Sequence, residues 1–125
     1  MDGSERPLEW VGTSYRDLLA LPAPVRQFFG YALSLAQAGY RHNAAKVLKG
    51  FGDAGVLEVV EDHGNGTYRA VYTVRFKEAV FVLHCFQKKS TRGIGTPAEH
   101  MSIVRARLKV VERLVKEWRD EKKGH

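Results

Sequence analysis

The spacing of apolar residues changes from a helical to a strand period near the middle of the chain, and this change most limits the possible fold. Between Pro24 and Gly39 apolar residues recur every three or four positions, which is typical of one face of a helix. From Val56 to Phe86, β-branched and aromatic residues form strand-like runs, and Asn65-Gly66 between two of them is a strong hairpin signal. The sequence therefore predicts an α+β fold with helices packed on an antiparallel sheet.

The predicted elements follow one another without a linker or an internal repeat, so we expect one domain spanning residues 1–125, with disordered tails at about 1–7 and 119–125. An N-terminal strand at Leu8–Val11 and two helices should precede a three-stranded meander, and Thr96-Pro97 should open a C-terminal helix, with Thr96 as its N-cap. Between the second helix and the meander we expect a basic connection over 41–49, with room for a helical turn at Asn43–Val47.

The register of the predicted meander decides which side chains share a face. If Lys77-Glu78 forms a two-residue turn, Tyr72 faces Leu83 and Arg69 faces Phe86. One face is then apolar and meets the helices, whereas the other is mixed and carries Arg69, His84 and an exposed Phe86. The apolar seam of the last helix, from Met101 to Trp118, fits packing either on its own sheet or against a partner.

Composition narrows the functional classes. The chain has 20 Lys and Arg against 14 Asp and Glu, a net charge of +6, which favours a polyanionic partner. A single cysteine excludes a disulfide framework, and the five histidines lack the spacing of a metal pair, so we expect no metal or cofactor and place Cys85 in the core. No apolar run approaches the roughly 18 residues of a membrane span, so we expect a cytoplasmic protein without a membrane partner.

Residues 50–55 match a dinucleotide-binding glycine pattern by letters. That motif needs a strand before it and a helix after it, so that the pyrophosphate lies on the helix N-terminus. Here a strand should follow, and we interpret the glycines as a turn.

Cations gather where the predicted last strand ends, and they suggest an RNA site. Lys88, Lys89 and Arg92 follow that strand, and Lys49 precedes the meander. Together with Arg69 and an aromatic ring they are suited to hold phosphates by charge and a base by stacking. The alternative is an ordinary solvated charged surface.

Four motifs in this order resemble the RelE/HigB superfamily of bacterial type II toxins, and within it the phage-related HigB-like branch. They are Leu48-Lys49-Gly50, Tyr68-Arg69-Ala70-Val71-Tyr72, His84-Cys85-Phe86-Gln87-Lys88-Lys89 and Thr96-Pro97. The resemblance implies a ribosome-dependent mRNA endoribonuclease that works without metal, in which a ribose 2′-hydroxyl attacks the adjacent phosphate. It also implies an antitoxin partner, usually a helix-turn-helix protein of the HigA type.

The resemblance places Arg69, Lys88 and Lys89 on the scissile phosphate, and we expect Arg69 and Lys89 to stabilise the charge that develops there. We expect Lys49, Lys88 and Arg92 to hold the RNA and Phe86 to stack a base, with His84 as general acid or base because imidazole titrates near neutrality.

The chain also departs from the family. Segment 57–62 reads Leu57-Glu58-Val59-Val60-Glu61-Asp62, where some RelE members carry active-site lysines, and Trp118 is the only aromatic residue after Phe86. Two alternatives therefore stay open, a ParE-like gyrase inhibitor on the same fold and a non-catalytic RNA- or ribosome-binding module.

Overall fold

The computed structural model describes residues 5–53, 55–88 and 96–124 of the chain. Its five strands form one sheet in the order β1-β5-β4-β3-β2. β1 (Leu8–Trp10) runs parallel to β5 (Val80–Lys88), and the other neighbours are antiparallel: β2 (Ala45–Val47), β3 (Val56–His63) and β4 (Gly66–Thr73). The predicted α+β class is confirmed, and so is the meander, which is formed by β3, β4 and β5.

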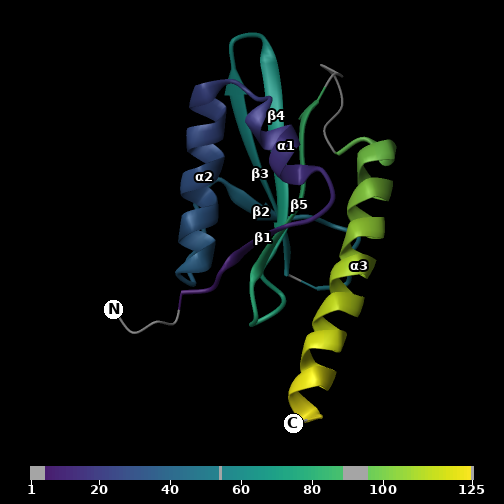
Figure 1. Cartoon of the computed structure of the whole chain (residues 1–125). Coiled ribbons are helices and arrows are strands. Elements are labelled where there is room, and N and C mark those ends of the chain that lie inside the picture. The colour runs from purple at the N-terminus through teal and green to yellow at the C-terminus, as the bar shows by residue number, and fades with distance from the viewer. Residues whose placement is uncertain (1–4, 54, 89–95, 125) are drawn as a thin grey trace.

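Helices cover both faces of this sheet, and Figure 1 shows α2 and α3 on opposite sides of it. α1 (Ser14–Leu19) and α2 (Ala23–Gln37) pack on one face, and α3 (Ala98–Lys123) packs on the other. We expected the second face to be mixed, and the seam of the last helix to pack either on its own sheet or against a partner. The first alternative is found: four α3 residues, Val104, Leu108, Val111 and Val115, are buried against this face. None of the described helices has the length and hydropathy needed to cross a membrane.

A β-bulge changes which side chains of β5 face α3. β4 and β5 keep the predicted pairing of Arg69 with Phe86, but the register shifts by one residue between Val71 and Tyr72. Tyr72 consequently faces Val82, where we predicted Leu83, and Leu83 packs toward α3. The connection after β4 is also longer than the predicted two-residue turn, since β5 begins only at Val80.

The hairpin between β3 and β4 turns one residue earlier than predicted. β3 ends at His63 and β4 begins at Gly66, so Gly64 and Asn65 form the turn. Gly64 has a φ of 60°, the left-handed conformation that glycine supplies at the first position of such a turn. The resulting register differs from ours by two residues, which leaves every β3 side chain on its predicted face.

Three segments differ from the sequence-based expectation. Residues 45–47 form the edge strand β2 and not a helical turn, because Lys46 pairs with Glu58 of β3. α3 continues past Trp118 to Lys123 where we expected a disordered tail, and Arg119 forms an ion pair with Glu78 at 2.6 Å. Near the N-terminus, within the other expected tail, the Arg6 guanidinium donates to the carbonyls of Val74 and Phe76.

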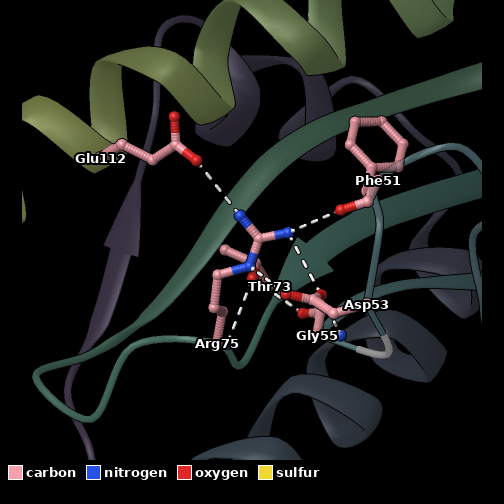
Figure 2. A network of polar contacts seen from close by, with 6 residues as sticks. All are labelled: Phe51, Asp53, Gly55, Thr73, Arg75 and Glu112. Atoms are coloured by element: carbon pink, nitrogen blue, oxygen red, sulfur yellow. Dashed lines mark hydrogen bonds and ion pairs between the residues drawn. The ribbon is translucent and has the colours of Figure 1, made fainter.

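Arg75 ties the glycine-rich loop before β3 to the sheet and to α3, as Figure 2 shows. Its guanidinium pairs with Asp53 at 3.0 Å and with Glu112 of α3 at 3.2 Å, and it donates to the Phe51 carbonyl. The expected strand, β3, follows the loop, which therefore lacks the helix that a dinucleotide motif requires. The loop is a structural connection held by one arginine.

Candidate functional site

A buried ion pair forms the first part of the candidate site. Arg69 of β4 and Glu58 of β3 approach to 2.9 Å between Nη1 and Oε2, and their side chains are only 11% and 13% exposed. The Thr96 hydroxyl, just before α3, donates to the same carboxylate oxygen. Arg69 Nε is buried without a hydrogen-bond partner among the described residues. Glu58 thus holds the guanidinium in place by a charge-assisted contact.

Three stacked rings form the second part, beside Arg69. Phe86 faces Arg69 across β4 and β5. The His100 ring of α3 stacks on Phe86 with centroids 3.9 Å apart, and the His84 ring lies 4.7 Å from Phe86. The two imidazoles approach to 2.8 Å between His84 Nε2 and His100 Nδ1. This cluster joins the end of β5 to the first turn of α3.

Arg107 of α3 holds this ring cluster in place through its contact with His84. It donates to the Leu83 carbonyl at 2.8 Å and to the Thr13 hydroxyl at 3.1 Å, and its Nη1 lies 3.4 Å from His84 Nδ1. The Thr13 hydroxyl in turn donates to Asp17. One arginine therefore links the loop before α1, β5 and the ring cluster.

Burial disfavours the charged form of both imidazoles. It is the main cause that lowers the pKa of His84 to about 4, with further lowering by His100 and the Arg107 cation. Burial also lowers the pKa of His100, against an opposing effect of Glu99. On the same strand, burial raises the pKa of Cys85 to about 12, so this thiol is an unreactive core group, as predicted.

A cleft of about 850 Å³ opens beside these rings. It exists because β1 pairs with β5 only as far as Val82, which leaves the rest of that strand edge between α1 and the start of α3. Asp17 lines it from α1, Glu99 and His100 from α3, and His84 and Phe86 from β5. Mostly small and apolar residues complete the lining, and among the described residues neither a lysine nor an arginine, Arg69 included, lines this cleft.

The structure brings some of the predicted site residues together. Arg69, His84 and Phe86 lie in one cluster on the α3 side of the sheet, as their shared face predicted. Lys88 lies further along the same strand, opposite Thr67, and is buried. Lys49 is exposed, two residues after β2.

Other predictions need correction or lie beyond the described residues. We expected an exposed Phe86, but the ring is buried because His100 covers it, so a base cannot stack on it directly in this arrangement. Lys89 and Arg92 lie outside the described residues.

Four further residues of the site were not singled out from the sequence. Glu58 was placed on the face of Arg69 by register, yet its pairing with Arg69 depends on the closed sheet. Thr96 was expected to cap α3, but Pro97 is the N-cap residue and the Thr96 hydroxyl serves Glu58. Nothing in the sequence around His100 and Arg107 marks them as site residues, since the groups that they contact lie on β5 and in the loop before α1.

Replacing Gly12 with alanine should destabilise the protein by about 1–3 kcal/mol. Gly12 has a φ of 59°, and an added Cβ would lie 2.7 Å from Arg107 Nε. The matched control is Gly30→Ala in α2, where nothing lies within 4 Å of the added carbon and a gain of roughly 0.5–1 kcal/mol is expected. Urea denaturation of both variants measures the difference, and equal stabilities would contradict this interpretation of Gly12.

The free energy of unfolding should fall as the pH drops from about 6.5 toward about 4. The folded-state pKa of His84 lies below its ordinary value, so the unfolded chain binds the proton more tightly and the associated stability, up to about 3 kcal/mol, is present above pH 6.5. Denaturation at several pH values tests this against His84→Gln. The free energy of unfolding of the variant should decline less steeply with falling pH than that of the wild type. Parallel pH curves for the two proteins would contradict the role given to His84.

Comparison with known proteins shows which family and which fold this chain matches. The family model described as phage derived protein Gp49-like (DUF891) matches residues 16–109. A solved structure of a mutant of the Escherichia coli toxin RelE in the free state is similar with a TM-score of 0.55 and 21% sequence identity, covering 86% of this chain and 98% of that one. No curated protein sequence matches the chain significantly. The RelE-like fold is thereby confirmed, and the chain belongs to the phage-derived Gp49-like family of the RelE/HigB superfamily.

Proposed function

We propose that this protein is a RelE-type toxin that cleaves mRNA on the ribosome and so inhibits translation. The observation that carries the proposal is the placement of Arg69, in the Tyr-Arg strand motif: Glu58 fixes its guanidinium, and it faces Phe86 beside the two histidine rings. Membership of the Gp49-like family supports the toxin assignment. Because ribosomes are its site of action, the protein works in the cytoplasm.

The proposed reaction breaks one phosphodiester bond. The ribose 2′-oxygen attacks the adjacent phosphorus, the bond to the 5′-oxygen breaks, and a 2′,3′-cyclic phosphate remains. Arg69 donates to a non-bridging oxygen and, with Lys89, stabilises the charge that develops there. Glu58 touches that guanidinium and takes the proton of the 2′-hydroxyl as general base, while water supplies a proton to the 5′-oxygen.

The remaining predicted residues have supporting roles in this proposal. Lys49 and Arg92 hold the RNA backbone by charge, and the buried Lys88 adds positive potential near the end of β5. Phe86 supports the His100 ring by stacking against it. His84 acts through His100, since its two ring nitrogens already face His100 and Arg107.

Ribosomes programmed with a defined message test the proposal. The purified protein should produce new 5′ ends within the codon in the ribosomal decoding site, with cyclic phosphate on the upstream fragment. Free mRNA should be cut far less. A ParE-like inhibitor would instead block gyrase supercoiling, and a non-catalytic module would bind ribosomes without new ends, and either result contradicts the proposal.

A partner antitoxin follows from the same proposal. A small helix-turn-helix protein of the HigA type, encoded beside this chain, should bind it and neutralise it. Co-expression should restore growth of cells that produce this protein. Failure of the neighbouring gene product to bind or protect would contradict this part of the proposal.

A further inference from the structure

The contact between His84 and His100 has a direction that the neighbouring arginine sets. A guanidinium donates hydrogen bonds and cannot accept them. Because Arg107 Nη1 faces His84 Nδ1 at 3.4 Å, that nitrogen is the acceptor and the His84 proton resides on Nε2. His84 Nε2–H therefore donates to His100 Nδ1 across 2.8 Å. The His100 proton must then reside on Nε2, the ring nitrogen not engaged by His84, and His100 lines the cleft.

This order of donors resists protonation of either ring. A proton on His100 Nδ1 would meet the His84 N–H, and turning His84 around would aim an N–H at Arg107. The charged groups near the pair act from several elements: Asp17 from α1, and Arg107 and Glu99 from α3. The carboxylates of Asp17 and Glu99 favour a charged imidazole, yet burial outweighs them, and the pKa of each histidine is lowered.

We propose that His100 presents a fixed, uncharged Nε2–H donor to the cleft for an oxygen or nitrogen acceptor of bound RNA, and that Arg107 sets this tautomer through His84. This rests on the proposed function for the identity of the ligand. His100 contacts the RNA, whereas His84 and Arg107 are positioning residues. A neutral donor gives the same hydrogen bond at any pH in the physiological range, unlike an imidazole that titrates.

The carboxylates around His100 fit this assignment. A phosphate is repelled by Asp17 and Glu99, which line the same cleft, so the charged backbone belongs on the Arg69 side of the rings. The cleft then receives the uncharged part of a nucleotide, a base or a ribose. For such a group a neutral donor suffices, with the stacked His100 ring as its platform.

Nitrogen-detected NMR of the ring nitrogens in the full chain tests the tautomers without any cleavage assay. Both histidines should show protonated Nε2 and unprotonated Nδ1 at pH 7.5. In Arg107→Leu nothing donates to His84 Nδ1 from this position, so part of the His84 population should carry its proton on Nδ1. A wild-type His84 protonated at Nδ1, or a wild-type ring that becomes cationic near pH 6.5, would overturn the proposal.

Cleavage by two His100 variants tests the donor itself. His100→Phe keeps a ring on Phe86 but has no donor, and should lower the cleavage rate on the order of 10²-fold. His100→Gln keeps an N–H and should stay within about tenfold of wild type. Equal rates for His100→Phe and wild type would overturn the contact with RNA. Absence of cleavage by the wild type would instead contradict the proposed function, while the NMR result would still decide the tautomers.

Discussion

Replacing Arg69 with glutamine should lower mRNA cleavage on the ribosome by on the order of 10²–10³-fold and abolish growth inhibition. Glutamine keeps a donor toward Glu58, so the buried carboxylate is not left alone as it would be after Arg69→Ala. What is lost is the positive charge on the proposed scissile phosphate. Rates of appearance of new 5′ ends measure the effect, with circular dichroism and thermal unfolding to establish the fold.

Arg75 supplies the matched control for this experiment. It follows β4 on the same chain segment and forms two ion pairs, but its partners are the glycine-rich loop and α3 (Figure 2). Arg75→Gln should reduce stability and leave the cleavage rate of the folded protein unchanged. A folded Arg69→Gln variant that cleaves as fast as wild type would remove Arg69 from the mechanism.

Replacing Glu58 with glutamine should change binding and catalysis in opposite directions. In the free protein the carboxylate competes with RNA phosphate for Arg69, so its neutralisation should tighten binding to the programmed ribosome by roughly three- to tenfold. The same change removes the proposed general base and should lower the cleavage rate by about 10²–10⁴-fold. Binding is measured with a 2′-deoxy message that cannot be cut, and cleavage in single-turnover experiments.

Glu61→Gln is the control for Glu58. It removes one negative charge from the same strand at a partly buried position, whereas Glu58 is the carboxylate that contacts Arg69. It should leave both quantities near the wild-type values. If Glu58→Gln weakened binding and cleavage together, the carboxylate would be an organiser of the site and not its base.

The order of elements could be predicted because each has a local cause. Periodicity located α2 and α3, and Pro24 and Pro97 located their first turns to within a residue. The pairing of Arg69 with Phe86 followed from alternation along β4 and β5, and it placed the centre of the site. Local sequence and the pairing of Arg69 with Phe86 were therefore enough to predict the order of the elements and the centre of the site.

The bulge and the ring cluster could not be predicted, because neither has a local cause. The run from Val80 to Leu83 is apolar on both sides. The alternation of polar and apolar residues therefore cannot reveal a register shift of one residue. Arg107 reaches His84 and Thr13 from another helix, and His100 covers Phe86 from the turn where α3 begins. Burial of Arg69 and Phe86 likewise follows only once α3 lies on the second face of the sheet.

The role of the 2′-hydroxyl is the claim on which the mechanism depends, and it can be tested with one pair of messages. Ribosomes are programmed with an all-ribose message or with the same message carrying a single 2′-deoxy nucleotide at the mapped cleavage position. We predict cleavage to a cyclic phosphate in the first and none at that position in the second. Cleavage of the deoxy position at the same rate would show that another nucleophile attacks and would contradict the account.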